Sequence, residues 1–278
     1  MSTINLIAPA KVNFVLNIIG RRDDGFHELE TVMQAIDLHD DVEIQWERQT
    51  GAAAVCACGG GCDIQLDPGR ADLPAGPKNL AYKAAFWMHN KFHREWRESV
   101  KIRIVKRIPV AAGMAGGSAN GAAVLYGLAK LWGLTEDKAA MERVYELAAE
   151  MGSDVPFCLA VQEGRRAALG TGRGEKLEFI EPLECRIETV TPSIAVSTAK
   201  VYGALTPDDY KNQLDVHAFI NAKTLEEKCA LMGNHLQAPA TRMFPKIQKT
   251  IDELSSNNDA LITMQSGSGP TVFSVFRK

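Results

Sequence analysis

The 278-residue chain has no hydrophobic run of membrane length and no excess of positive charge. No apolar stretch approaches the roughly 18 residues that a membrane-spanning helix requires. The formal net charge of −3 gives no basic field that would attract nucleic acid, and no nucleic-acid-binding motif is present. The first residues lack the layout of a signal peptide. We therefore expect a cytoplasmic protein that binds neither membranes nor nucleic acids.

The sequence also lacks a complete zinc motif. Cys56, Cys58 and Cys62 lie in or beside a stretch of small residues at 51–61, but no fourth ligand stands at a spacing typical of zinc sites. Three clustered thiols could bind a metal, yet reduced thiols on a surface loop are the more frequent case in the cytosol. We therefore assign no metal to these cysteines.

The composition is that of an ordinary globular protein, without internal repeats or long low-complexity tracts. Hydrophobic residues make up 46% of the chain and charged residues 23%, and both values are close to the average for such proteins. A chain of 278 residues has room for two modest domains or one large one. We place a domain boundary near residue 164, which predicts domains at 1–163 and 164–278.

Strand and helix patterns mix along the chain without strict alternation. This mixture favours an α+β architecture over a doubly wound sheet. The predicted elements are strand pairs at 4–19, a loop at 51–78, helices at 79–96, 121–132 and 137–151, a strand at 100–105, two strands within 165–180, a strand near 186–190, helices between 214 and 255, and two closing strands around 265–270.

The most informative stretch is the glycine-rich loop at 108–120, Ile-Pro-Val-Ala-Ala-Gly-Met-Ala-Gly-Gly-Ser-Ala-Asn, which follows the strand at 100–105 and leads into an apolar helix. Its glycines let the backbone turn tightly and approach an anion, and the free N–H groups and dipole of the helix start favour negative charge. The pattern predicts a phosphate-binding loop. A plain glycine-rich turn before a core helix is the alternative. The loop matches neither of the two common nucleotide signatures, G-x-x-x-x-G-K-[ST] and G-x-G-x-x-G.

Three separated segments resemble one family, the GHMP small-molecule kinases. The first is Ala-Pro-Ala-Lys-Val-Asn-Phe at 8–14, continuing into 20–29; the second is the glycine-rich loop at 108–120; the third is Ser-Gly-Ser-Gly-Pro-Thr-Val-Phe at 266–273. The segment 151–157 also fits, and the motifs span nearly the whole chain in the order of the family.

The loop and the last motif are shared across the family, whereas one element resembles a single branch. Asp-Gly-Phe-His-Glu-Leu at 24–29 is similar to the members whose substrate carries a cytidine diphosphate group. The resemblance implies a two-domain α+β GHMP kinase fold with the active site in the cleft between the domains. It also implies a monomer or homodimer that uses ATP and Mg²⁺ to phosphorylate the 2-hydroxyl of that substrate in the non-mevalonate route to isoprenoid precursors.

Two other functions stay open at this point. A kinase of the same fold could act on another small alcohol, such as homoserine or mevalonate, but the element at 24–29 disfavours this alternative. A nucleotide-binding regulator of the same fold, without catalysis, is the second alternative. The presence of both Lys11 and Asp154 disfavours it, because a protein that only binds nucleotide has no need for this pair.

The resemblance assigns catalysis to Lys11 and Asp154. Phosphoryl transfer needs an acceptor hydroxyl that is positioned, a group that accepts its proton, and compensation of negative charge. On this interpretation Asp154 accepts the proton, while Lys11 orients the hydroxyl and offsets charge. From local sequence alone, Lys11 could be a solvated cation at a strand edge, and Asp154 a turn or N-cap residue.

The same resemblance assigns ATP to the glycine-rich loop, with the phosphates on 113–118 and the Ser118 hydroxyl on phosphate or Mg²⁺. Asn79 and Lys106 are expected near the adenosine, although Asn79 could be only a helix N-cap and Lys106 an exposed strand residue. The expected ATP-binding residues are Pro109, Val110, Ala111, Ala112, Gly113, Met114, Ala115, Gly116, Gly117, Ser118, Asn79 and Lys106.

For the second substrate, the resemblance implies that Phe26 and Tyr202 flank the cytosine and that His27 binds its polar edge. Asn13 and Thr198 would contact the sugar-phosphate or erythritol part. The aromatic residues could equally belong to the core or a rim, His27 could be structural, and the last motif could be only a tight turn. The expected substrate-binding residues are Asn13, Phe26, His27, Thr198, Tyr202, Gly267, Ser268 and Gly269.

Overall fold

A computed structural model describes residues 1–49, 61–93 and 97–278 of the chain. The chain forms two compact units, of which the first consists of residues 1–10, 37–108 and 116–164 and the second of residues 11–36, 109–115 and 165–278. Strands β1 (Ser2–Arg21) and β2 (His27–Gln49) each contribute residues to both units. The last division falls at residue 164, but two earlier segments also belong to the second unit. The domains 1–163 and 164–278 stay a prediction.

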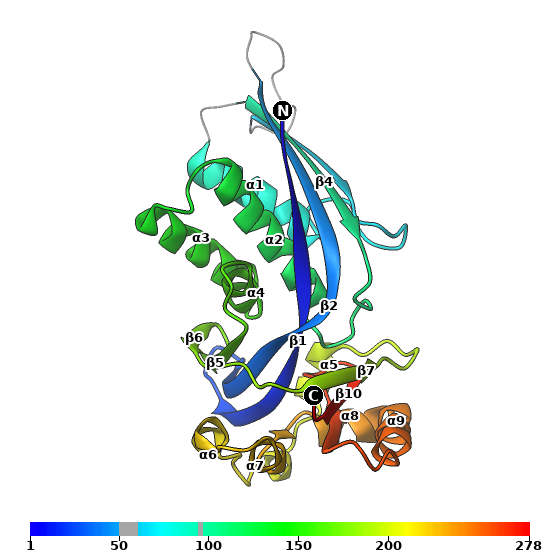
Figure 1. Cartoon of the computed structure of the whole chain (residues 1–278). Coiled ribbons are helices and arrows are strands. Elements are labelled where there is room, and N and C mark those ends of the chain that lie inside the picture. The colour runs from blue at the N-terminus through cyan, green and yellow to red at the C-terminus, as the bar shows by residue number, and fades with distance from the viewer. Residues whose placement is uncertain (50–60, 94–96) are drawn as a thin grey trace. The chain divides into compact units, whose positions relative to one another are not determined.

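The first unit is a sheet with helices packed on it. Its further elements are β3 (Cys62–Asp67), α1 (Leu80–Phe92), β4 (Arg97–Val105), α2 (Gly116–Leu131), α3 (Lys138–Met151) and α4 (Val155–Gln162). The strand order is β3-β4-β2-β1, with β3 parallel to β4 and β4 antiparallel to β2. Helices α1 and α2 pack on the sheet, and α3 and α4 pack on these helices (Figure 1).

Alternation along β4 explains why one face of this sheet is covered. Val100, Ile102 and Ile104 are buried, while the residues between them are exposed, as expected for a strand with one face in the core. Ile102 pairs with Ile44 of β2 in the antiparallel register. A Cβ atom at Gly127 of α2 would lie 2.4 Å from the Ile44 side chain. A side chain at 127 would therefore require the end of the Ile44 side chain to move.

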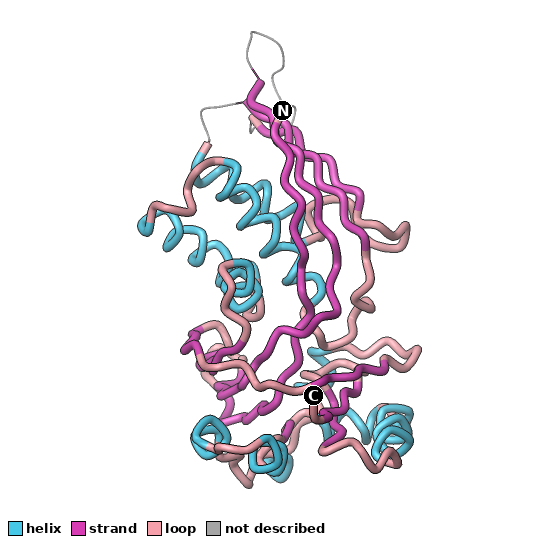
Figure 2. Tube along the Cα trace, viewed as in Figure 1, coloured by secondary structure: helices cyan, strands magenta, loops and turns pink. Residues whose placement is uncertain are grey.

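The second unit combines short strands and short helices (Figure 2). Its further elements are β5 (Ala167–Gly172), β6 (Lys176–Phe179), β7 (Arg186–Val190), α5 (Thr198–Gly203), a 3-10 turn (Pro207–Asp209), α6 (Val216–Asn221), α7 (Leu225–Ala230), β8 (Gly233–Asn234), α8 (Gln237–Met243), α9 (Pro245–Ser255), β9 (Ile262–Gln265) and β10 (Val272–Phe276). Strand β10 lies between β7 and β9, antiparallel to both, and is buried along its length. Strand β5 pairs antiparallel with β2 and β6, and β8 pairs parallel with β1.

Most predicted elements are confirmed, as is the α+β class. Helix α3 has Asp137 as N-cap and Gly152 as C-cap. Strands β4 to β7, β9 and β10, and the helices between 214 and 255, lie where the patterns indicate. The predicted helix at 79–96 begins as expected and ends at Phe92, and residues 94–96 lie outside the described residues. Among the described residues, no helix is long and apolar enough to cross a membrane.

Two predictions were wrong. Residues 4–19 form one long strand instead of a strand pair, because Pro9 and the asparagines of the segment lie singly within the strand and no turn forms before residue 22. The predicted loop at 51–78 contains β3, whose alternating exposure at 62–67 is a period-2 signal that the glycine-rich surroundings concealed. Cys56 and Cys58 lie outside the described residues.

Candidate active site

The part of the glycine-rich loop in the second unit has an unusual backbone. Ala111, Gly113 and Ala115 have φ angles of 53°, 77° and 58°, so every second residue is in the left-handed region. This conformation costs an L-residue such as alanine about 1–2 kcal/mol, and such strain is found mostly at functional sites. A left-handed residue that follows a right-handed one directs successive N–H groups toward one side, and such repeated left-handed positions are typical of an anion-binding nest.

The C-terminal motif packs directly against this loop within the second unit. A Cβ atom at Gly113 would lie 2.4 Å from the Ser266 carbonyl oxygen, and one at Gly269 would lie 2.2 Å from the Gly113 nitrogen. The Ser266 hydroxyl donates a hydrogen bond to the Gly113 carbonyl oxygen (3.1 Å), and the Thr271 N–H donates one to the Ala112 carbonyl oxygen (3.3 Å). The two backbones are therefore in contact, and side chains at 113 and 269 are excluded.

Lys11 is buried beside the same motif. Its side chain is 5% exposed, so the alternative of a solvated cation at a strand edge is wrong. The ammonium donates to Asn13 Oδ1 (2.7 Å), and Asn13 Nδ2 donates to the Thr31 hydroxyl (2.8 Å). A Cβ atom at Gly267 would lie 3.8 Å from Lys11 Nζ, and the Lys11 N–H donates to the Met114 carbonyl oxygen (3.2 Å). The second unit thus brings Lys11, Asn13, the loop and the C-terminal motif together.

The residues expected at the cytosine also lie in the second unit. The rings of His27 and Tyr202 face each other with centroids 5.2 Å apart. Phe26 is 53% exposed, and the Arg173 guanidinium lies 5.1 Å from its ring centroid. Burial and the charge of Arg21 lower the pKa of His27 below its usual value. A neutral imidazole offers one donor and one acceptor nitrogen, so His27 can bind either kind of polar group.

Two further predicted contacts are close to each other. The Thr198 hydroxyl lies 2.8 Å from the Ser268 hydroxyl. Thr198 is the first residue of α5, and Ser268 belongs to the C-terminal motif. This hydrogen bond joins two of the predicted substrate-binding residues.

In the first unit, the loop is anchored by a carboxylate that sequence analysis missed. Asp40 is fully buried and accepts hydrogen bonds from Lys106 Nζ (2.5 Å), the Arg107 and Ile108 N–H groups (2.7 and 2.9 Å) and Asn120 Nδ2 (2.8 Å). The Lys106 side chain is 6% exposed, so the alternative of an exposed strand residue is wrong. Nothing in a single sequence marks Asp40, because its partners come from other segments.

The start of α2 offers accessible backbone donors. The helix begins at Gly116, so the N–H groups of its first turn have no intrahelical partner. Gly117 is exposed and Ser118 is partly exposed. A Cβ atom at Gly116 would lie 3.3 Å from Lys106 Nζ, which places that ammonium at the helix start. The helix dipole adds to the positive potential there.

Asn79 and Asp154 both stand at helix N-termini of the first unit. Asn79 accepts a hydrogen bond from the Ala81 N–H (3.0 Å) and donates to the Pro74 carbonyl oxygen (2.9 Å). Its interpretation as an N-cap is confirmed, and its role at the adenosine stays a prediction. Asp154 occupies the N-cap position of α4, but its side chain makes no capping hydrogen bond.

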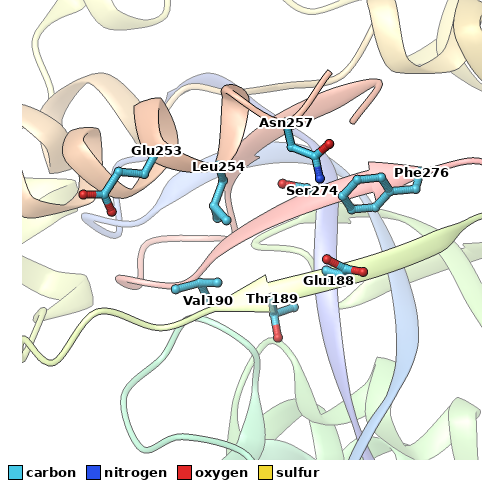
Figure 3. Close-up of a pocket in the computed structure, with 8 residues that line it drawn as sticks. All are labelled: Glu188, Thr189, Val190, Glu253, Leu254, Asn257, Ser274 and Phe276. Carbon is cyan, nitrogen blue, oxygen red and sulfur yellow. The ribbon is translucent and has the colours of Figure 1, made fainter. Parts of the chain in front are cut away.

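A hollow in the second unit is lined by other residues than the predicted site residues. It has a volume of about 390 Å³ and is bounded by β7, β10 and the end of α9 (Figure 3). The lining residues are Glu188, Thr189, Val190, Glu253, Leu254, Asn257, Ser274 and Phe276. None of these residues was predicted to bind ATP or substrate.

Family models match both parts of the chain. The model described as GHMP kinases N terminal domain matches residues 79–161, and the model described as GHMP kinases C terminal matches residues 216–278. The first match contains the start of α2, and the second contains the motif that packs against the loop.

Curated proteins match over nearly the full length. The chain is 39% identical over 277 residues to the 4-diphosphocytidyl-2-C-methyl-D-erythritol kinase of Exiguobacterium sibiricum, with 98% of this chain and 89% of the relative covered. It is 38% identical over 270 residues to the protein of the same name of Bacillus subtilis, with 96% and 86% covered.

Solved structures give the same result. A crystal structure of a 4-(cytidine 5'-diphospho)-2C-methyl-D-erythritol kinase has a TM-score of 0.73 and 31% identity, covering 98% of this chain and 90% of the other. The homoserine kinase from Cytophaga hutchinsonii has a TM-score of 0.72 at 16% identity, covering 99% and 85%. At that identity, the second match reflects a shared fold alone.

Proposed function

The chain belongs to the GHMP kinases, and within them to the family of 4-diphosphocytidyl-2-C-methyl-D-erythritol kinases, and from this membership we infer its reaction. It transfers a phosphoryl group from ATP to a hydroxyl of 4-diphosphocytidyl-2-C-methyl-D-erythritol in the synthesis of isoprenoid precursors. The acceptor that we propose is the 2-hydroxyl, with Mg²⁺ accompanying ATP. We further propose that the chain works in the cytoplasm as a monomer or homodimer.

The observation that carries this function is the backbone of the glycine-rich loop. The left-handed residues Ala111, Gly113 and Ala115 give it the form of an anion-binding nest, and ATP phosphates are the anions that a kinase must hold. Ser118 contributes a partly exposed hydroxyl. Mg²⁺ keeps several waters and shares phosphate oxygens, so one protein hydroxyl fits its needs; when bound, the ion neutralises charge on the phosphates.

Lys11 and Asp154 are the catalytic residues of this proposal. Asp154 accepts the proton of the acceptor hydroxyl, a role for a carboxylate that does not cap its helix. Lys11 compensates negative charge, and its hydrogen bond to Asn13 fixes the direction of its ammonium. The burial of Lys11 supports a charge held in place before the reaction, which costs no reorganisation when the phosphoryl group moves.

The cytidine is proposed to bind at Phe26, His27 and Tyr202. The exposed ring of Phe26 offers a stacking face, and the ring of Tyr202 beside His27 offers a second. His27, with its lowered pKa, presents a donor and an acceptor to the polar edge of the base. Asn13 and Thr198 are assigned to the sugar-phosphate or erythritol part, next to Gly267, Ser268 and Gly269.

The reaction is tested by ADP release from Mg²⁺-ATP in the presence of different acceptors. We expect turnover with 4-diphosphocytidyl-2-C-methyl-D-erythritol, and none with homoserine, mevalonate or no acceptor. Turnover with another alcohol alone would contradict the proposed substrate. ATP binding without turnover on any acceptor would favour the regulator of the same fold.

Replacing Asp154 by Asn tests the proton acceptor. We expect the Asp154→Asn variant to lose on the order of 10²–10⁴-fold in kcat, with ATP affinity within about twofold of the unmodified chain. Asp137→Asn is the matched control, because Asp137 also stands at a helix N-terminus of the first unit but caps it through Ala139 and Ala140, a role that Asn also fills. Full turnover of Asp154→Asn would reject the assignment.

A further inference from the structure

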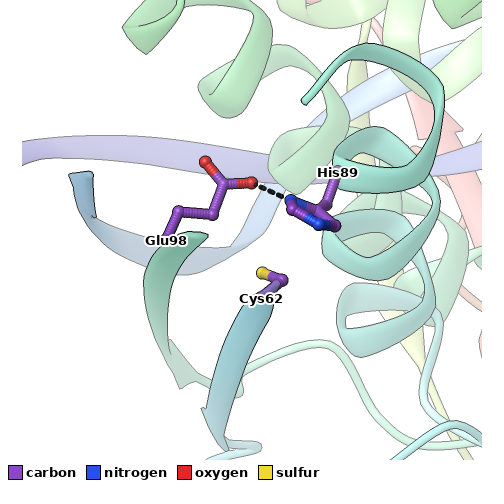
Figure 4. A group of neighbouring side chains, drawn as sticks. All are labelled: Cys62, His89 and Glu98. Carbon is purple, nitrogen blue, oxygen red and sulfur yellow. Dashed lines mark hydrogen bonds and ion pairs between the residues drawn. The ribbon is translucent and has the colours of Figure 1, made fainter. Parts of the chain in front are cut away.

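Three buried side chains of the first unit, none of them a predicted site residue, lie close together. Cys62 is the first residue of β3, His89 lies in the last turn of α1, and Glu98 lies in β4 (Figure 4). Their exposed fractions are 5%, 0% and 0%. One ligand atom from each, a sulfur, a ring nitrogen and a carboxylate oxygen, lies within 4.8 Å of the other two. The cluster is thus built from three elements distant in sequence.

Hydrogen bonds orient the cluster but leave one atom unused. Glu98 binds His89 Nδ1 (2.6 Å) through Oε1, and His93 Nδ1 (3.2 Å) and Trp46 Nε1 (2.5 Å) through Oε2. The other ring nitrogen of His89, Nε2, is buried and has no hydrogen-bond partner among the residues that the structure describes. Buried polar atoms in native proteins nearly always have a partner, so an exception points to a missing ion or water.

We propose that Cys62, His89 and Glu98 form a binding site for a zinc-class divalent cation. A thiolate, an imidazole and a carboxylate are the three ligand types that Zn²⁺ takes from proteins. His89 Nδ1 and Glu98 Oε1 now share a hydrogen bond of 2.6 Å, and the ion would take the place of this bond, with Nδ1 and Oε1 as its ligand atoms. The proton of the Cys62 thiol leaves when the ion binds.

The geometry requires only small movements. With metal–ligand bonds of about 2.0–2.3 Å, tetrahedral ligand atoms lie roughly 3.5 Å apart, and the three atoms here are within 4.8 Å of one another. The three backbones come from neighbouring elements, since Cys62 pairs directly with Glu98 across β3 and β4. A bound ion would hold β3, β4 and the end of α1 together.

Catalysis by the same residues is not supported. A cysteine beside a histidine can act as a nucleophile, but a substrate must reach the sulfur, and all three side chains are buried. The site that we propose is therefore structural. His89 and Glu98 lie on other elements, distant from Cys62 in sequence. The spacing of the cysteines therefore does not reveal this site.

The experiment uses the full chain, stripped with a chelator and titrated with Zn²⁺ against a chromophoric competitor. We expect one tight site that Cys62→Ser and His89→Gln each weaken by at least about tenfold. Cys158→Ser is the matched control, because Cys158 is also buried in the first unit but lies outside the cluster, and it should bind Zn²⁺ as the unmodified chain does. Absence of tight binding, or tight binding that neither cluster variant weakens, would overturn the proposal.

Two further measurements keep the proposal testable if a variant does not fold. Zn²⁺ should raise the Tm of the unmodified chain and of Cys158→Ser but not that of Cys62→Ser. If either cluster variant fails to fold, the unmodified chain decides the matter through ¹H–¹⁵N spectra of its six histidine side chains. A shift of the His89 ring nitrogens with one equivalent of Zn²⁺ supports the site, and unchanged His89 resonances reject it.

Discussion

The glycine-rich loop is held by opposite means at its two parts. In the second unit, residues 112 and 113 contact the backbone of 266–271, and glycines make the approach possible. In the first unit, the loop entrance is held by one buried carboxylate, Asp40, which binds a side-chain cation and two backbone N–H groups. Where two backbones pack closely, the sequence must have glycines, and these can be recognised. An aspartate that is buried in the fold cannot be told from an exposed one by its residue type.

Substitutions in the two parts of the loop should also have different effects on the protein. Backbone contacts depend on volume, so one added methyl group forces a displacement. A buried carboxylate depends on charge and on several donors at once, and its removal leaves a buried cation uncompensated. The first kind of change should act mainly on activity, through the position of the loop, and the second mainly on stability. The four predictions below separate these effects.

The largest effect is expected from Asp40→Asn. The substitution keeps the shape but leaves Lys106 buried without a counter-charge, so the free energy of unfolding should fall by about 3–5 kcal/mol. Urea unfolding followed by circular dichroism measures it. Asp41→Asn is the matched control, since Asp41 is 42% exposed and pairs with Arg107 at the surface, where an ion pair contributes less than about 1 kcal/mol. Equal losses in the two variants would show that Asp40 is not a buried anchor.

Gly269→Ala should come second and act on catalysis. Its Cβ would lie 2.2 Å from the Gly113 nitrogen and 2.3 Å from the Ala112 carbonyl carbon, so the loop must move. A displacement of this size can lower kcat/KM by roughly 10²-fold, through a weaker apparent affinity for ATP. Steady-state kinetics measure the change, and Gly76→Ala, where nothing lies within 4 Å, serves as control. Unchanged kinetics in Gly269→Ala would separate the C-terminal motif from the loop.

The same contrast explains how much could be predicted from the sequence. Local signals predicted α3 from its apolar face and from Gly152 as its C-cap, β4 from alternation, and the loop from its glycines. The family resemblance added the C-terminal motif, whose contact with the loop no local pattern shows. The assignment of Lys11 and Asp154 to catalysis stays a prediction.

What the sequence did not reveal depends on contacts between distant segments. Asp40 acquires its role from Lys106 and Asn120, and Cys62 meets His89 and Glu98 only in the folded chain. In each case the missing information was a tertiary partner, which residue type and spacing do not contain.

A double-mutant cycle measures how strongly Asp40 and Lys106 stabilise each other. Lys106→Met should also destabilise the chain, because it leaves Asp40 buried with its charge uncompensated. The double variant with Asp40→Asn should be more stable than the sum of the single losses predicts, with a coupling energy of about 0.5–3 kcal/mol. Urea unfolding of the four proteins gives this energy. Strict additivity would mean that Asp40 acts through the Arg107 and Ile108 N–H groups and Asn120, and not through Lys106.

The smallest effect concerns the strained backbone itself. Ala111 is exposed with φ of 53°, so Ala111→Gly removes a left-handed penalty of about 1–2 kcal/mol and adds an unfolded-chain entropy cost of about 0.4–1 kcal/mol. The net result should be a stabilisation of about 0–1.6 kcal/mol. Ala112→Gly, at a neighbouring position that is 3% exposed and not left-handed, gains nothing from relief of strain and should lose about 1 kcal/mol. Opposite signs in urea unfolding would establish the alternating backbone in solution. A loss of equal size in both variants would mean that Ala111 is not left-handed there, and the nest that supports the phosphate site would lose its basis.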